Sequence, residues 1–212
     1  MRIRHTVYLL ALAFAATAAA QTWELGASGG YGLYKNASVS AGGATATAGF
    51  DSGPALSVFG VQNLYKHLSG EFRYTYQFDD LLVSSSGQKV TFTGVSHTIN
   101  YDLMYLFGSP DSPLRPYVAG GGGIKYYRGT GTETLAQPLN QFAILSKTNQ
   151  VEPVISVGGG VKIKAGRRTN VYAEFRDYIG PVPQNVVAPV PTAKMSGWLH
   201  DIVPMIGVTY SF

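Results

Sequence analysis

The sequence contains no cysteine in its 212 residues. This absence excludes disulfide bonds and metal sites built from thiolates. Charged residues are also scarce, at 13% of the chain, against about 25% in typical soluble domains. After residue 20, no apolar run approaches the roughly 18 residues that indicate a membrane-spanning helix. A membrane location would therefore require a closed β-barrel, because only helices and closed barrels satisfy all backbone hydrogen bonds in lipid.

The amino terminus has the three parts of a secretory signal peptide. Arg2 and Arg4 precede an apolar run at residues 7–16, which a small-residue cleavage site follows. The run is too short for a membrane-anchor helix, because the hydrocarbon core of a bilayer is about 30 Å thick. We therefore expect a signal peptide at residues 1–20 and a mature chain of one domain at residues 21–212.

The charge of the mature chain is nearly balanced. Two of the 16 basic residues lie in the signal peptide, and none of the 12 acidic residues does. Removal of the signal peptide therefore lowers the formal net charge from +4 to +2. The mature sequence has no basic cluster beyond Arg167 and Arg168, and none with interleaved aromatic residues. This pattern excludes nucleic acid as an expected partner.

Eight segments carry apolar residues at alternate positions, which is the period of a β-strand. The expected strands are residues 23–34, 54–65, 68–78, 91–106, 117–127, 152–164, 171–179 and 199–212. Long solvent loops follow the first, third, fifth and seventh strands, and the other connections are short. This alternation favours an up-and-down barrel with its long loops outside the cell. The sequence therefore predicts an all-β fold, an eight-stranded antiparallel transmembrane barrel in the bacterial outer membrane.

The third expected strand shows the clearest alternation. Phe72, Tyr74 and Tyr76 share one face, whereas Glu71 and Arg73 lie on the other. A lipid-embedded barrel places the aromatic face outside and the charges in the lumen. A soluble sandwich would place the same aromatic face in its core, so this strand alone leaves both folds open. The segregation of long loops to one end favours the barrel.

The last strand ends on an aromatic carboxyl terminus. Ile206, Val208, Tyr210 and Phe212 occupy alternate positions on one face. This strand resembles the closing strand of bacterial outer-membrane β-barrels. The resemblance implies insertion into the outer membrane by the barrel assembly machinery, with Phe212 as part of the recognised signal. Pro204 lies on the same face and lacks a backbone N–H, so we expect a β-bulge there.

Three short motifs extend the resemblance to a named family. They are RPYVAGGGG at residues 115–123, AEFRDY at residues 173–178 and GVTYSF at residues 207–212. With the eight-strand layout, they make the mature chain similar to the OmpA-like outer-membrane β-barrel domain family. The resemblance implies outer-membrane lipid and lipopolysaccharide as surroundings. The chain departs from full-length OmpA proteins in that we expect a barrel alone, without their peptidoglycan-binding domain.

Aromatic residues near the strand ends are candidates for interfacial girdles. The expected girdle residues are Trp23, Tyr34, Tyr65, Tyr105, Tyr117, Tyr127, Tyr172 and Trp198. Inward-facing charges of both signs are the other feature of the predicted strands, and an eight-stranded barrel is narrow enough for side chains to fill it. They are Glu24, Glu71, Arg73, Asp102, Lys125, Glu152, Lys162, Glu174 and Arg176.

Six of these inward charges are the candidate site of the protein. The predicted lumen network consists of Glu71, Arg73, Glu152, Lys162, Glu174 and Arg176. A structural salt-bridge plug that satisfies buried charge is one interpretation. A gated polar pathway is the other. Arg73 and Arg176 lie on strands that are distant in a closed barrel, so their groups could meet only across the lumen.

The sequence offers no clear catalytic or metal-binding set. Ser96 and His97 are adjacent, but neighbouring residues on a strand point to opposite faces and cannot act as a nucleophile and its base. There is no GxSxG motif, and His67, His97 and His200 lack metal-ligand spacing. The glycines at residues 120–123 lack the setting of a phosphate loop and are interpreted as packing glycines. We therefore expect no catalytic residues, no metal and no cofactor.

Three functions remain open from the sequence. The first is a structural or surface-interaction barrel whose long loops meet an extracellular ligand, because loops carry function more often than scaffolds. The second is a narrow channel for small solutes. The third is a lipid-modifying outer-membrane enzyme, although the expectation from the residues is that the protein is not an enzyme.

Overall fold

The structure is a computed structural model that describes residues 22–133 and 136–212. The expected signal peptide, residues 1–20, lies outside the described residues. No helix in the described part of the chain is long and apolar enough to cross a membrane.

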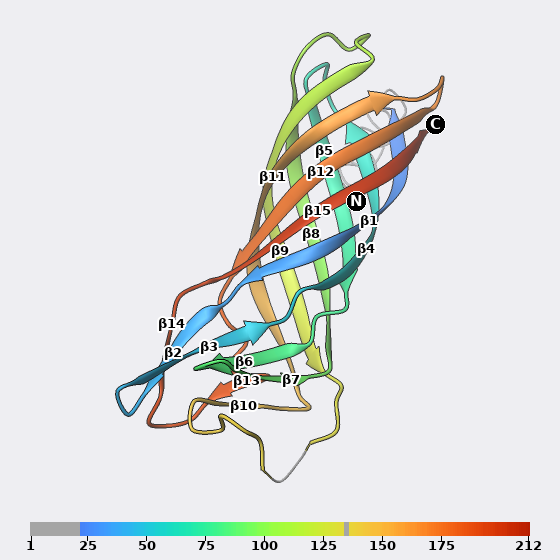
Figure 1. Cartoon of the computed structure of the whole chain (residues 1–212). Helices are drawn as coiled ribbons and strands as arrows, with labels where there is room; N and C mark the ends of the chain where they lie inside the picture. Colours follow the sequence, from blue (N-terminus) through green and yellow to red (C-terminus); the bar gives the residue numbers. More distant parts are fainter. Residues whose placement is uncertain (1–21, 134–135) are drawn as a thin grey trace, which may run out of the picture.

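Eight long strands form a closed antiparallel barrel, as the sequence predicts (Figure 1). Each pairs with the next along the chain, and the last closes the barrel against the first. The barrel strands are β1 (Trp23–Lys35), β4 (Gly53–Asn63), β5 (Leu68–Gln77), β8 (Gly94–Leu106), β9 (Leu114–Gly129), β11 (Asn149–Lys164), β12 (Thr169–Gly180) and β15 (Leu199–Ser211). The short connections meet at one end of the barrel, here called the turn end, and the long connections at the other, the loop end.

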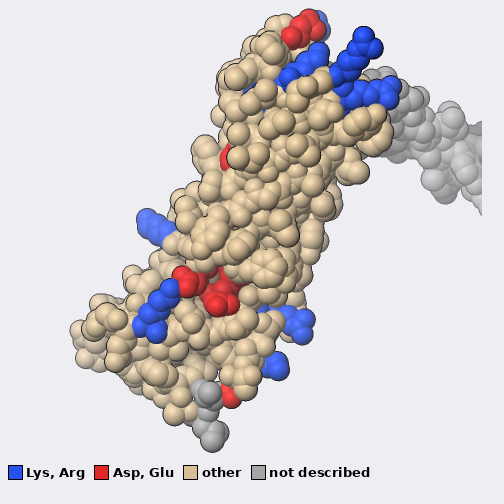
Figure 2. Space-filling view, turned by 45° about the vertical axis from the view of Figure 1, so that its right-hand side comes forward, with Lys and Arg blue, Asp and Glu red and all other residues tan. Residues whose placement is uncertain are grey.

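Side chains on each strand alternate between the lumen and the outer wall. On β15, Ile206 is 68% exposed whereas its neighbour Met205 is 3% exposed. Figure 2 shows the result on one face of the molecule, where charged atoms gather towards both ends and the wall between them is almost uncharged. An apolar band between two charged zones is the outer surface of a barrel that spans a membrane.

Four of the expected girdle tyrosines do not face lipid. Trp23, Tyr65, Tyr105 and Trp198 are exposed on the outer surface. The prediction is wrong for four others, which point inward: Tyr34, Tyr117, Tyr127 and Tyr172. Their positions have the same parity as the inward charges, so three of their hydroxyl groups hydrogen-bond charged groups inside the lumen.

Pro204 does not produce the expected bulge. Gly30 pairs with Met205 and Leu33 pairs with Ile202, so the register of β1 against β15 is the same on both sides of Pro204. On its other edge β15 stays in continuous register with β12. The prediction of a bulge is therefore wrong, because the missing N–H interrupts the ladder to β1 without insertion of an extra residue.

The glycine-rich part of β9 allows close contact with β8. A Cβ on Gly121 would lie 2.0 Å from the carbonyl oxygen of Tyr101 and 2.5 Å from Oδ1 of Asp102. A Cβ on Gly123 would lie 2.0 Å from the carbonyl oxygen of Ile99. These glycines therefore leave space for neighbouring backbone and for a buried lumen carboxylate, which agrees with their interpretation as packing glycines.

The long connections fold into a second structure, here called the loop module, and are not the open solvent loops that the sequence predicts. Five short strands form a sheet in the order β14-β2-β3-β6-β7, and two more form a separate pair. The strands of the loop module are β2 (Ala37–Ala41), β3 (Ala44–Phe50), β6 (Leu81–Ser85), β7 (Gln88–Phe92), β10 (Ala143–Leu145), β13 (Val187–Pro189) and β14 (Lys194–Ser196). The expected strand at residues 91–106 is accordingly too long, because its first two residues belong to β7.

One hydrophobic core joins all four long connections to the loop end of the barrel. Its members include Val39, Phe50, Leu81, Phe142 and Val186, all of which are at most 3% exposed. Figure 1 shows the short strands gathered below the barrel, across its loop end. The loop module is therefore a packed unit with its own core.

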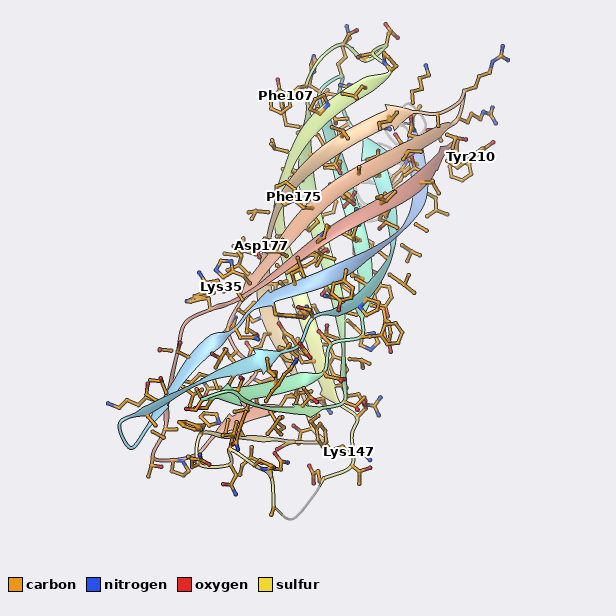
Figure 3. The ribbon with its side chains drawn as sticks, viewed as in Figure 1. Lys35, Phe107, Lys147, Phe175, Asp177 and Tyr210 are labelled. Carbon is orange, nitrogen blue, oxygen red and sulfur yellow. The ribbon has the colours of Figure 1, made fainter. Side chains whose placement is uncertain are left out.

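We expect Val39→Ala to open the loop module while the barrel stays folded. The side chain of Val39 is fully buried in this core, and loss of its two methyl groups costs about 2 kcal/mol of local stability. Trypsin digestion of the folded protein in detergent should then cut faster at the loop lysines, such as Lys147 (Figure 3). Val58→Ala on the outer wall, where Val58 is 55% exposed, is the matched control. Equal digestion of both variants would contradict a packed module.

Candidate functional site

The centre of the lumen holds two arginines and three carboxylates. Arg73 Nε lies 2.9 Å from Glu71 Oε1, and its Nη2 lies 2.5 Å from Glu174 Oε1. Arg176 Nη1 lies 2.5 Å from Asp102 Oδ2, and its Nη2 lies 3.0 Å from Glu71 Oε1 and 3.1 Å from Glu174 Oε2. All five side chains are fully buried in these pairs. We call these five residues the central cluster.

The central cluster joins strands that do not touch along the wall. Glu71 and Arg73 lie on β5, whereas Glu174 and Arg176 lie on β12, and neither strand neighbours the other in the barrel. Their side chains meet across the lumen. Each guanidinium contacts carboxylates from both strands, which ties opposite walls of the barrel together. Charge-assisted hydrogen bonds of this kind are roughly twice as strong as neutral ones.

A second cluster lies nearer the loop end and is centred on Lys125. Its ammonium group donates to Asp201 Oδ2 at 2.5 Å, to Tyr34 Oη at 2.7 Å and to Gln77 Oε1 at 2.9 Å. The carboxylate of Asp79 lies 4.0 Å away and accepts a hydrogen bond from Tyr34 Oη. One cation thus serves two buried carboxylates.

A third cluster surrounds Glu24 near the turn end. Lys162 forms an ion pair with Oε1 of Glu24. Oε2 accepts hydrogen bonds from Thr209 at 2.8 Å and from Asn170 and Tyr172 at 3.2 Å each. Asn63 of β4 donates to Oε1 at 2.9 Å, so polar side chains from four different strands hold this carboxylate in place.

The structure brings together four of the six residues predicted for the lumen network, namely Glu71, Arg73, Glu174 and Arg176. Lys162 is separate from them, in the cluster around Glu24. Glu152 belongs to no cluster. Its carboxylate is partly buried near the loop end and accepts a hydrogen bond from Gln150 on the same strand. The expectation that it joins the network is therefore wrong.

Two carboxylates of the Lys125 cluster were absent from the predicted lumen charges. Asp201 has the inward parity of the last strand, so a count along β15 could have placed it in the lumen. Asp79 follows the end of β5, where strand parity gives no direction for a side chain. Its burial depends on the fold of the loop module above it, which local sequence does not reveal.

Burial raises the pKa of Asp79 to about 6, although Lys125 and two hydroxyl donors oppose the shift. The folded protein therefore binds a proton between about pH 4 and pH 6 that the unfolded chain has released. Unfolding stability should rise as the pH falls through this window, because linkage favours the state that holds more protons.

We expect Asp79→Asn to reduce this pH dependence. Between pH 7 and pH 5, the free energy of unfolding of the wild type should rise by roughly 1 to 2 kcal/mol more than that of the variant. Urea unfolding at each pH measures it. The asparagine keeps the shape of the side chain but does not titrate in this range. A pH profile identical in the two proteins would contradict the assignment to Asp79.

His97 and His200 lie on the outer wall, apart from the lumen clusters. The ring of His97 hydrogen-bonds Tyr74 Oη at 2.7 Å, and His200 Nδ1 lies 2.8 Å from Asp177 Oδ2. Within residues 22–133 and 136–212, no serine hydroxyl hydrogen-bonds either ring. No group of three potential metal ligands occurs in the same ranges. The geometry thus supports charge pairing more than acid–base chemistry.

A family model described as outer membrane protein beta-barrel domain matches residues 6–185. Among solved structures, the chain is similar to Neisserial surface protein A (NspA), with 12% identity, a TM-score of 0.54, and coverage of 90% of this chain and 97% of that one. It is also similar to the outer membrane protein OprG from Pseudomonas aeruginosa, with 16% identity, a TM-score of 0.57, and coverage of 91% and 95%. At these identities the likeness concerns the fold. No curated protein matches the sequence significantly.

Proposed function

Because this chain belongs to the outer membrane protein β-barrel domain family and is located in the bacterial outer membrane, we propose that it is a closed barrel that presents a surface-interaction module. In this proposal the loop end faces outward and the loop module meets an extracellular ligand. Lipid and lipopolysaccharide surround the wall, and the barrel assembly machinery recognises the strand that ends at Phe212.

The observation that carries the proposal is the loop module itself. A packed core beneath a five-stranded sheet holds the long connections in one arrangement. The exposed face of its strands carries many hydroxyl groups and few charges. Ser38 and Ser40 on β2 and Thr45 and Thr47 on β3 are exposed there. A rigid polar surface of this kind suits recognition, because little conformational entropy is lost when a ligand binds.

The filled lumen supports a closed barrel over a narrow solute channel. The charged groups of the central cluster are fully buried and pair with one another across the lumen, which leaves them few free positions for a passing solute. The lipid-modifying enzyme has less support. The carboxylate–histidine pair of Asp177 and His200 lies on the outer wall, but no serine in the described ranges hydrogen-bonds its ring.

Binding to defined surface molecules tests the interaction role. Cells that display the wild-type protein should bind at least one class on an array of surface polysaccharides and matrix proteins. Thr45→Glu with Thr47→Glu should abolish that binding, because the two new carboxylates lie on the proposed surface. Thr22→Glu, which adds a carboxylate at the opposite, turn end of the barrel, is the control. A glutamate at Val58 would face lipid and is therefore not used. Failure of wild type to bind any class would contradict the proposed function.

A further inference from the structure

A cavity of about 210 Å³ opens at the turn end of the barrel. It is lined by residues from several strand ends and from two turns. They are Thr22, Glu24, Asn63, Pro110, Ser112, Arg115, Lys162, Lys164, Arg167, Asn170 and Ser211. The strand residues have the parity of lumen-facing positions, so the cavity is the mouth of the lumen and lies apart from the lipid-facing wall. We call it the turn-end mouth.

The turn-end mouth carries a large excess of positive charge. Its lining contains Arg115, Lys162, Lys164 and Arg167 but only one carboxylate, that of Glu24. The central cluster, by contrast, has more carboxylates than cations. Like charges around one concave surface repel each other, and low-dielectric walls strengthen the field in the cavity. An anion in the mouth would relieve this repulsion.

The single carboxylate of the mouth is already occupied. Glu24 accepts hydrogen bonds from Asn63 at 2.9 Å and from Thr209 at 2.8 Å, in addition to its ion pair with Lys162. Lys164 and Arg167 have no carboxylate partner within residues 22–133 and 136–212. Two of the four cations are therefore available for another anion.

The guanidinium of Arg115 is held in place but not neutralised. Its Nη2 donates to the carbonyl oxygen of Lys66 in the neighbouring turn at 2.7 Å. Its Nε is buried and has no hydrogen-bond partner in the described part of the chain. A buried donor without an acceptor costs about 1–3 kcal/mol. Arg115 is thus a third cation of the mouth without a carboxylate partner in the described part of the chain.

We propose that the turn-end mouth binds a phosphate group. The planar guanidinium of Arg115 can donate to two oxygens of one phosphate, while the ammonium of Lys164 and the guanidinium of Arg167 supply further charge. Under the orientation proposed above, the phosphate enters from the periplasm. It belongs either to a free phosphorylated solute or to the headgroup of a phospholipid, because both present the same oxygens.

Titration with inorganic phosphate tests the site. The folded barrel in an uncharged sugar detergent at low salt should bind phosphate in isothermal titration calorimetry. Arg115→Gln combined with Arg167→Gln should raise the dissociation constant about tenfold or more, because charge-assisted hydrogen bonds are lost. Lys164→Gln should weaken binding without any effect on folding, because the ammonium group of Lys164 has no hydrogen-bond or ion-pair partner within residues 22–133 and 136–212. The matched control is Arg128→Gln, on the same strand as Arg115 but at the loop end.

The outcomes separate the site from its two phosphate sources. Absence of phosphate binding by wild type, or equal affinity in wild type and in the Arg115 and Lys164 variants, would overturn the proposal. Equal weakening by Arg128→Gln would also overturn it, because the effect would then be one of net charge alone. If binding persists in nanodiscs that contain phosphatidylglycerol, the source is a solute. If the lipid competes with phosphate at Arg115, the source is the headgroup. The surface-interaction role of the loop module does not depend on any of these results.

Discussion

Replacement of Arg176 by alanine should destabilise the barrel more than any other single change in the lumen. The guanidinium contacts Glu71, Asp102 and Glu174 within 2.5–3.1 Å, and all of these groups are fully buried. Without it, Arg73 remains as the one cation of the central cluster beside three carboxylates. Removal of one partner of a buried ion pair costs about 3–5 kcal/mol, because the remaining charge is left uncompensated.

Two measurements report this loss of stability. One is heat modifiability on gels, and the other is unfolding by urea of the protein inserted in lipid vesicles. The temperature at which the folded band disappears should fall strongly for Arg176→Ala. Arg168→Ala is the matched control, because this arginine lies in an exposed turn and, among the residues that the structure describes, its guanidinium donates only to Tyr210 Oη at 3.3 Å. An unchanged midpoint for Arg176→Ala would show that the central cluster does not hold the barrel together.

Replacement of Ile206 by arginine should impair insertion of the barrel into a bilayer. Ile206 is 68% exposed at the middle of β15, so a soluble protein would tolerate a charge there. In a membrane the same charge faces hydrocarbon. An arginine on the lipid face at the bilayer midplane costs about 2–4 kcal/mol, and this cost falls to about 0–1 kcal/mol near the interfaces.

The depth dependence supplies the control for Ile206→Arg. Tyr210 lies on the same face of β15 but near the turn end (Figure 3), where an arginine should reach the headgroups. Folding yields in vesicles should therefore follow the order wild type, Tyr210→Arg, Ile206→Arg. Equal yields for the two variants would contradict a lipid-embedded wall at Ile206.

The barrel itself follows from sequence because its two governing patterns are local. Alternation along β5, with Phe72 outside and Glu71 and Arg73 inside, repeats a period of two that any reader of the sequence can count. The parity of long and short connections then orders the strands. Tyr117 and Tyr172 lie near strand ends but have the parity of lumen positions, so parity and not nearness to a strand end decides that they point inward.

The loop module cannot be predicted from local sequence patterns. Its strands are short, and small residues such as Ala46 and Ala48 form part of its core. Residues of this size also occur in ordinary solvent loops. The module exists because segments distant in sequence pack together, as when Phe50 of β3 stacks on Tyr127 at the loop end of β9 with ring centroids 4.7 Å apart. Such contacts leave no local periodic pattern.

The candidate site was partly predictable for a related reason. Parity placed Arg73 and Arg176 in the lumen, and a closed barrel order allowed their groups to meet across it. Parity does not give the height of a side chain along the barrel axis. Parity therefore predicts Glu152 together with the residues of the central cluster, whereas the structure places it near the loop end.

Planar-bilayer conductance of the purified, folded protein tests the central claim most directly. The account predicts a closed barrel, because the central cluster joins opposite walls of the lumen through Arg73 and Arg176. Wild type should therefore give no steady current above the bare bilayer at neutral pH. A reproducible ohmic current from folded wild-type protein would contradict the closed lumen and would favour a channel for small solutes.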